Sequence, residues 1–380
     1  MSYASVDALQ KTLSEQVFHY ASDSKKAAGR ALGTLVEIIT FYTLRSWGFR
    51  HALAIERPLP EYGNPAITHN VEYSLHPVVA QSSVRIDNTR LPLSAAKICK
   101  AAVETNPEWN LTGGSNQLLS SSKILKNACV IAETKNGPCV AHLDSFSNDT
   151  AKIHASLLHR HPFAIFECKR VGIEEGNKKG PQTIEKAKQG AYVARTVSSL
   201  QKVRLKDGGL GGLIHPLSGP LICEPYEALL KKIIESNTAD LLRDFVLTVG
   251  VVSNHGNWFT SENHNKELKV LAQSYDWLLF LTDKGLAEFI SEMLLKPTRE
   301  LLPAKTAFLA SYTGEKGKNR FTKTQMDMDA DAVLFKYFSK NAKRVERWFN
   351  IITPSAGTLG LLRRNLDSLS HKNWGQIHSL

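Results

Sequence analysis

Apolar positions at helical spacing mark the first long element of this chain. A Ser-Asp-Ser stretch at residues 22–24 can cap a helix, and Gly48 can end one. Between them, apolar side chains recur every three or four positions. They are Leu32, Leu35, Val36, Ile39 and Tyr42. This pattern predicts one amphipathic helix that runs from the cap to Gly48.

Further along, short apolar runs alternate with helical patterns. The residues 151–170 predict two strands joined by a turn at 160–162, since Arg, His and Pro there follow one apolar run and precede another. The other predicted strands are 69–79, 244–252 and 276–283. The other predicted helices are 93–105, 119–133, 182–200 and 262–275. This order predicts an α/β or α+β fold with a mixed central β-sheet flanked by helices.

The chain length of 380 residues favours one large domain with appendages, or two domains. We expect a helical arm over residues 1–24 and a core with insertions over 25–296. Residues 297–380 form a basic, helical C-terminal region in this interpretation. The stretch 331–350 predicts a basic amphipathic helix, because apolar positions precede a cluster of Lys and Arg.

Composition and charge narrow the function. Apolar residues make up 42% of the chain, which excludes a disordered protein. The net charge of +11 favours a polyanionic partner such as nucleic acid. The five cysteines are odd in number and form no Cys-x-x-Cys pair, which argues against a disulfide framework and a cysteine-rich zinc site. With no signal peptide pattern and no apolar run near the ~18 residues of a membrane helix, we expect a cytoplasmic protein without a membrane partner.

The most informative segment is the apolar strand that ends in Glu167-Cys168-Lys169. Side chains alternate along a strand, so Glu167 and Lys169 point to the same face. An acid and a base therefore project side by side from the end of a buried strand. The alternative is an ordinary Glu–Lys pair that faces solvent.

A second acid lies upstream. Asp149 precedes Glu167 by 18 residues, and a hairpin over the two predicted strands could bring the two carboxylates together. Neighbouring carboxylates repel each other unless a cation lies between them, and Mg²⁺ suits a site with one or two carboxylates. Asp144 is an alternative first acid, although it could equally be a turn residue.

Glu37 lies in the middle of the first amphipathic helix. Gly33, Phe41 and Leu44 lie on the same side of that helix. A carboxylate on such a face is costly unless it is paired or bound to a metal. Glu37 could therefore be a third acid of the site, or it could form an ion pair with Arg45 or another neighbour.

Several polar and basic residues are candidates for DNA contacts. Lys, Gln and the amides at a helix start suit phosphate oxygens, while Asn and His can meet base edges. The candidates are Lys178, Lys179, Gln182, Lys186, Gln189, Asn254, His255, Asn257, Lys343, Arg344 and Arg347. The alternative for each group is a solvated polar surface.

The acids, the Glu-x-Lys motif, the preceding helix and the following Lys/Gln helix together resemble the PD-(D/E)XK nuclease superfamily. Within it, the chain is most similar to type II restriction endonucleases, over about residues 25–290. The resemblance implies that Asp149 and Glu167 bind Mg²⁺, that Lys169 positions or activates the attacking water, and that Glu37 assists. One departure is that no proline precedes Asp149 or Asp144.

We therefore expect a Mg²⁺-dependent, sequence-specific endonuclease that hydrolyses double-stranded DNA in a restriction–modification system. A palindromic site would favour a homodimer, and a cognate DNA methyltransferase is the expected genetic partner. One alternative is a PD-(D/E)XK nuclease of DNA repair or phage DNA processing. Others are a catalytically inactive DNA-binding relative and a basic interaction protein.

Overall fold

The computed structural model describes residues 6–19, 23–61, 64–170, 190–253, 258–312 and 319–378. The chain forms two compact units that alternate along the sequence. Unit 1 contains residues 1–55, 78–161 and 283–348, and unit 2 contains residues 56–77, 162–282 and 349–380. The sequence predicted three consecutive regions, whereas the units are interleaved.

The helical part of unit 1 begins with the predicted amphipathic helix. Helix α2 (Ser24–Ser46) starts where the Asp23 side chain accepts a hydrogen bond from the Lys26 N–H (2.9 Å), which confirms the cap. Gly48 then adopts a left-handed conformation (φ 100°) just past the helix end. The N-terminal helix α1 (Val6–Gln16) packs against α2.

Further helices of unit 1 follow directly after α2 or come from the segment 283–348. They are the 3₁₀ turn η1 (Phe49–Ala52), α9 (Asp283–Ile290), the π-helical turn η3 (Ser291–Leu295), η4 (Arg299–Leu301), α10 (Leu302–Tyr312), α11 (Met328–Lys340) and α12 (Ala342–Glu346). Helix α11 packs on both α2 and α10. The basic helix predicted over 331–350 is thus two helices, because the chain leaves the helical conformation at Asn341.

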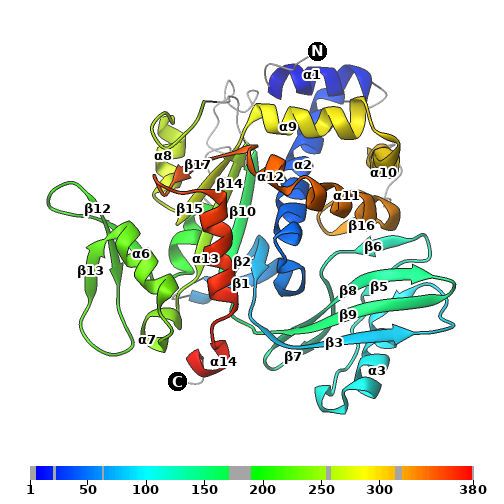
Figure 1. Cartoon of the computed structure of the whole chain (residues 1–380), viewed down its shortest axis with the longest axis horizontal. Helices are drawn as coiled ribbons and strands as arrows, with labels where there is room; N and C mark the ends of the chain where they lie inside the picture. Colours follow the sequence, from blue (N-terminus) through cyan, green and yellow to red (C-terminus); the bar gives the residue numbers. More distant parts are fainter. Residues whose placement is uncertain are drawn as a thin grey trace. The chain divides into compact units, whose positions relative to one another are not determined.

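Unit 1 also holds two antiparallel sheets. One has the order β3-β9-β8-β7, and the other has the order β16-β6-β5-β4 (Figure 1). The strands of the first are β3 (Val78–Ile86), β7 (Cys129–Thr134), β8 (Gly137–Ser147) and β9 (Thr150–Leu158). Those of the second are β4 (Leu93–Ser94), β5 (Gln117–Leu119), β6 (Ile124–Lys126) and β16 (Gln325–Asp327). Helix α3 (Ala95–Thr105), followed by the turn η2 (Pro107–Trp109), packs on β3 and β7, which confirms the helix predicted at 93–105.

The helix predicted over 119–133 is wrong. This stretch forms β5, β6 and β7, which are separated by tight turns at Lys123 and Ala128, both with positive φ. Buried side chains from it join a core shared with α3, β8 and β9. Packing against neighbouring strands therefore outweighs the helical spacing of the apolar residues in this stretch.

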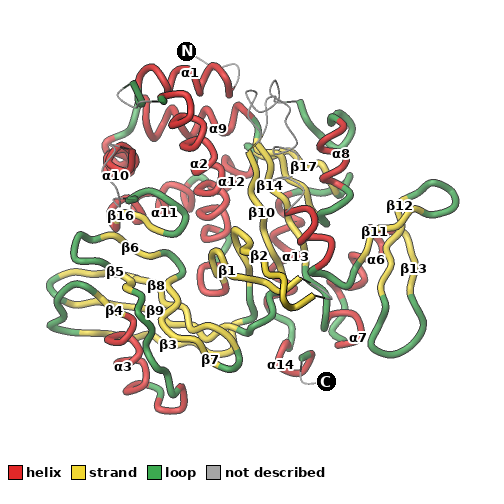
Figure 2. Tube along the Cα trace, turned by 180° about the vertical axis from the view of Figure 1, so that it is seen from behind, coloured by secondary structure: helices red, strands yellow, loops and turns green. Residues whose placement is uncertain are grey.

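Unit 2 is built on a six-stranded mixed sheet of order β1-β2-β10-β14-β15-β17 (Figure 2). Its strands are β1 (Leu53–Glu61), β2 (Asn64–Leu75), β10 (Ala164–Arg170), β14 (Leu247–Ser253), β15 (Trp277–Leu281) and β17 (Phe349–Thr353). Strands β10, β14 and β15 are parallel, while β2 and β17 run antiparallel to their neighbours β10 and β15. The strands predicted at 244–252 and 276–283 are confirmed as β14 and β15.

Helices and a small second sheet complete unit 2. The sheet has the order β11-β12-β13, with β11 (Gln201–Arg204), β12 (Leu210–Ile214) and β13 (Ile222–Pro225). The helices are a short helix over 190–196, α6 (Tyr226–Glu235), α7 (Ala239–Leu242), α8 (Lys266–Ala272), α13 (Leu359–Ser370) and α14 (Trp374–Ile377). Helix α8 confirms the centre of the helix predicted at 262–275. Residues 182–189 of the helix predicted at 182–200 lie outside the described residues, while 190–196 are helical and 197–200 are not.

The protein is therefore a mixed α/β protein whose central sheet is flanked by helices, as predicted. The predicted hairpin over 151–170 is wrong. The chain does turn at 160–162, but β9 pairs with β3 and β8 in unit 1, whereas β10 pairs with β2 and β14 in unit 2. The two strands joined by that turn belong to different sheets.

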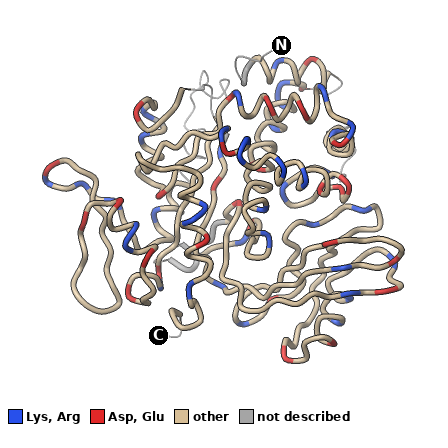
Figure 3. Tube along the Cα trace, viewed as in Figure 1, with Lys and Arg blue, Asp and Glu red and all other residues tan. Residues whose placement is uncertain are grey.

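The described helices include none that is both long and apolar enough to cross a membrane. Lys and Arg occur in both units, on α12 and α13 as well as along the strands β3 and β9 (Figure 3). No single described element collects the excess positive charge.

Candidate functional site

The carboxyl end of β10 presents an acid and a base. Glu167 is 1% exposed, and its Oε2 lies 3.9 Å from Nζ of Lys169, whose side chain is 31% exposed. The two side chains lie on one face of the strand, as the alternation predicted. A buried carboxylate thus lies below an ammonium group that reaches solvent.

A second carboxylate comes from the antiparallel neighbour β2. The ladder pairs Phe166 with Tyr73, and continuing it by one residue sets Glu72 opposite Glu167. Oε2 of Glu72 accepts a hydrogen bond from the backbone N–H of Cys168 (3.2 Å). The Glu72 carboxylate is therefore held at β10 itself, between the two residues of the Glu-x-Lys motif.

Two glycines make room for a tyrosine at this point. Gly250 of β14 is the register partner of Glu167, and a Cβ on Gly250 would lie 2.8 Å from the Tyr275 ring. At Gly190, a Cβ would lie 2.9 Å from the Tyr275 hydroxyl and 3.3 Å from Oε2 of Glu167. Because both positions lack a side chain, the Tyr275 ring and the helical residues 190–196 approach Glu167 closely.

The electrostatics of this group reflect its excess of negative charge. Burial raises the pKa of Tyr275 well above its ordinary value, and the carboxylates of Glu167 and Glu72 raise it further. Tyr275 therefore remains a neutral hydroxyl at physiological pH. We call Glu72, Glu167, Lys169 and Tyr275 the acid–lysine site. Its two carboxylates and one ammonium give a formal charge of −1.

Asp149 lies elsewhere in the fold. Asn148 and Asp149 form the two-residue turn between β8 and β9, both with positive φ, and the flanking residues Ser147 and Thr150 are paired. The backbone carbonyl of Asp149 accepts a hydrogen bond from Thr89 (2.8 Å). Because the predicted hairpin is not formed, strand pairing does not bring Asp149 to Glu167, and the spacing argument for Asp149 fails.

The other two predicted acids have partners within unit 1. Asp144 of β8 pairs with Nη1 of Arg50 (2.9 Å). Glu37 of α2 lies 3.6 Å from Nζ of Lys323, whereas Arg45 pairs with Asp331. The alternative of an ion pair therefore describes Glu37 correctly, with a neighbour other than Arg45.

Most of the predicted DNA contacts cannot be placed. Lys178, Lys179, Gln182, Lys186 and Gln189, together with Asn254, His255 and Asn257, lie outside the described residues. Of the C-terminal group, Lys343 and Arg347 are exposed. Arg344 is half-buried and donates to Glu292 (2.8 Å), so its charge is compensated within the protein.

The donor set of the acid–lysine site fits a hard cation. Among the described residues, no three His, Cys, Asp or Glu side chains are grouped to hold one metal ion. Mg²⁺ does not require such a group, because it retains several waters and takes only one or two carboxylates. Glu72 and Glu167 could supply those two ligands.

The sequence contained signals for the residues that were missed. Glu72 is the one acid in the predicted strand 69–79, and its neighbours Val71 and Tyr73 are buried. Gly250 interrupts an otherwise apolar strand, which typically marks a close approach of another group. The proximity of these residues to Glu167 depends on strand pairing over more than 80 residues of sequence, which local patterns do not specify.

Comparisons of the chain with protein-family models, with curated proteins and with solved structures found no match.

Proposed function

We propose that this protein is a Mg²⁺-dependent endonuclease of the PD-(D/E)XK kind, which hydrolyses phosphodiester bonds of double-stranded DNA. The observation that carries the proposal is the acid–lysine site. Glu167 and Lys169 project from one buried strand, and Glu72 joins them from the antiparallel neighbour. In this proposal Glu72 takes the place that the sequence resemblance assigned to Asp149 or Asp144.

The site supports this chemistry through its own residues. A Mg²⁺ ion held by Glu72 and Glu167 would polarise the phosphate and lower the pKa of a bound water. Lys169 reaches solvent beside Glu167 and can hold the attacking water or a phosphate oxygen. The Tyr275 hydroxyl stays protonated, and its ring packs against Gly250 near the two carboxylates.

The position at the end of parallel strands also supports a substrate site. Glu167 and Lys169 lie at the carboxyl end of β10, which runs parallel to β14, and ligands of α/β proteins bind outside such ends. The net charge of +11 favours DNA as the polyanion. A restriction enzyme with a palindromic site would act as a homodimer alongside a cognate methyltransferase.

The proposal is tested by incubating plasmid DNA with the protein in EDTA, Ca²⁺, Mg²⁺ or Mn²⁺, and by sequencing the product ends. We expect discrete fragments in Mg²⁺ and Mn²⁺, and none in EDTA. Ca²⁺ should support binding with little cleavage, because it acidifies water less than Mg²⁺ does. Glu167→Gln should abolish cutting.

The matched control is Glu235→Gln, the same change at an exposed residue of unit 2 that pairs across a helix turn with Lys231 (3.8 Å). It should cut like the parent protein. Random products in Mg²⁺ would favour a nuclease of repair or DNA processing. Binding without cleavage under every condition would favour a DNA-binding relative, and strong cutting in EDTA would refute the metal-dependent proposal.

A further inference from the structure

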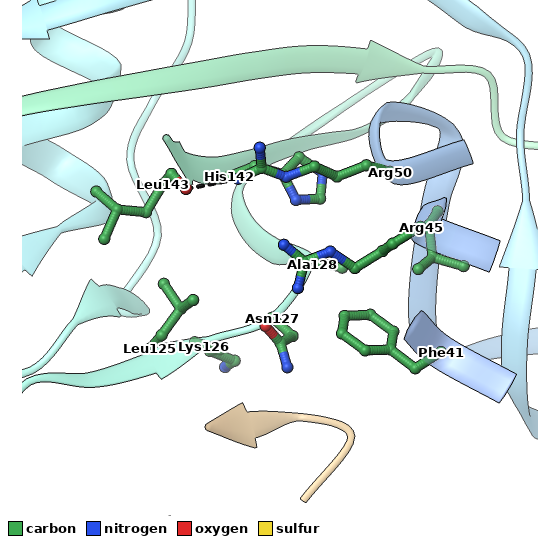
Figure 4. A pocket seen from close by; sticks show the side chains of 10 residues that line it. Phe41, Arg45, Arg50, Leu125, Lys126, Asn127, Ala128, His142 and Leu143 are labelled. Atoms are coloured by element: carbon green, nitrogen blue, oxygen red, sulfur yellow. Dashed lines mark hydrogen bonds between the residues drawn. The ribbon is translucent and has the colours of Figure 1, made fainter. Parts of the chain in front are cut away.

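Unit 1 contains a narrow pocket with basic walls, to which the proposed nuclease chemistry assigns no role. Arg45 from α2 and Arg50 from η1 line it on one side, and Lys126, Asn127 and His142 line it on the other (Figure 4). The guanidinium of Arg45 reaches into the pocket between the His142 ring and Asn127 (Figure 4). We call these five residues the arginine pocket.

The arginine pocket has a surplus of positive charge. Arg45 pairs with Asp331, and Arg50 pairs with Asp144. Lys126 donates to the neutral amide oxygen of Asn116 (2.6 Å), so no described carboxylate neutralises it. Three cations against two carboxylates leave a formal charge of +1.

The cations act on one another across this pocket. Burial lowers the pKa of Arg50, and the nearby Arg45 lowers it further. The pKa of His142 is also lowered, by burial and then by the charge of Arg50, so its ring is neutral at physiological pH. The contribution of the neighbouring cations to both shifts means that a negative charge placed here would be attracted.

Two buried nitrogen atoms at the pocket have no acceptor among the described residues. Nε of Arg45 and Nε2 of His142 are both inaccessible to solvent, and no described group is hydrogen-bonded to either atom. The Arg45 and His142 residues are only 6% and 7% exposed. A buried donor without an acceptor is destabilising, so the site is suited to a group that supplies acceptor oxygens.

We propose that the arginine pocket binds an oxygen of a phosphate group, with Arg45, Arg50 and His142 as donors and Lys126 as a further cation. The interior admits about one water-sized group, so a single oxygen would enter while the rest of the phosphate stays at the mouth. The positive surplus attracts an anionic phosphate, and guanidinium groups match its oxygens. The source is either the terminal phosphate of a nucleic acid or free phosphate.

The test measures thermal stability against inorganic phosphate, with sodium chloride at the same ionic strength as the reference. We expect phosphate to raise the melting temperature more than chloride does. The double variant Arg50→Gln/Asp144→Asn removes an ion pair from the pocket without changing the net charge. It should weaken phosphate binding by at least about tenfold, as expected for loss of a charge-assisted hydrogen bond.

The matched control is Arg85→Gln/Asp87→Asn, which removes an exposed ion pair on β3 of the same unit (2.9 Å) and also preserves the net charge. It should bind phosphate like the parent protein. If the first double variant does not fold, Lys126→Gln, at a half-buried residue of the same pocket, should also weaken phosphate binding. Equal effects of phosphate and chloride would show that the pocket holds water only and would overturn the proposal, as would equal losses in both double variants.

A competition experiment then distinguishes the two sources. Displacement of phosphate by a 5′-phosphorylated DNA duplex, but not by its 5′-hydroxyl counterpart, identifies a nucleic-acid end as the ligand. Binding of inorganic phosphate alone identifies free phosphate, and both results support the pocket. None of the five residues belongs to the acid–lysine site, so these measurements do not depend on whether the protein cleaves DNA.

Discussion

The acid–lysine site of unit 2 and the arginine pocket of unit 1 carry formal charges of opposite sign. Both bury ionised groups beside a partly exposed one. The first holds two carboxylates against one ammonium, and the second holds three cations against two carboxylates. Burying an unbalanced charge is costly, so the sign of each surplus indicates the ligand that would balance it. The ligand proposed for unit 2 is therefore a cation, and the ligand proposed for unit 1 is an anion.

The largest expected effect concerns the one ammonium of the acid–lysine site. Lys169→Ala should reduce DNA cleavage by about 10³-fold, because it removes a charge beside the reacting phosphate. DNA affinity should change little, since one lysine among many contributes little to total phosphate attraction. Cleavage rates and gel-shift affinities of the same preparation measure both. Near-normal cleavage would exclude Lys169 from the site.

The identity of the second acid gives the next largest effect. Glu72→Gln should reduce cleavage by about 10²-fold, because the carboxylate next to Glu167 loses its charge. Asp149→Asn, in an exposed turn, should cut at the rate of the parent protein. Single-turnover rates in Mg²⁺ compare the two. The reverse ranking, in folded proteins, would return the role to Asp149.

The balance of charge in unit 1 can be broken at Asp331. Asp331→Asn leaves the Arg45 guanidinium buried without its carboxylate, which should lower the free energy of unfolding by about 1.5–3 kcal/mol. Urea denaturation measures the loss. Asp87→Asn, in an exposed ion pair, should lower the free energy of unfolding much less. If the arginine pocket binds phosphate, phosphate should restore part of the stability lost in Asp331→Asn.

The smallest expected effect is a pH dependence of unit 1. Burial, and then the neighbouring His154 and Arg50, lower the pKa of His51 to about 4. In the unfolded chain His51 binds this proton at an ordinary pKa of about 6.5. The contribution of His51 to the free energy of unfolding is therefore lost as the pH falls from 6.5 to 4. His51→Gln should make the free energy of unfolding depend less on pH over this range. Urea denaturation at several pH values measures it. An unchanged slope would show that other groups, such as His142, account for it.

Local patterns predicted much of the fold where neighbours in sequence decide the outcome. The α2 helix was predicted from its Asp23 cap and from Gly48, and β14 and β15 were predicted from their apolar runs. The pairing of Glu167 with Lys169 on one face follows from strand geometry alone. These features depend on interactions within a few residues.

Other features depend on which distant segments pair, and the sequence misled there. The turn after β9 has the composition of a hairpin, yet β10 leaves it to pair with β2 and β14. The acid that lies beside Glu167 is therefore Glu72 of β2, 95 positions earlier in the sequence. Asp149 lies in the turn between β8 and β9, and neither of these strands pairs with β10. Only tertiary packing selects between these partners, since both candidate strands are apolar and of adequate length.

The interleaving of the two units has a consequence for how the protein is made. The chain passes between the units five times, and the last segments of units 1 and 2 are residues 283–348 and 349–380. A ribosome therefore has to release most of the chain before either unit has all its parts. Strand β17, on the edge of the central sheet, follows every other strand of that sheet in the sequence. The apolar strand β15 lacks its neighbour β17 until that segment is synthesised, and this period is when the nascent protein is most exposed to aggregation.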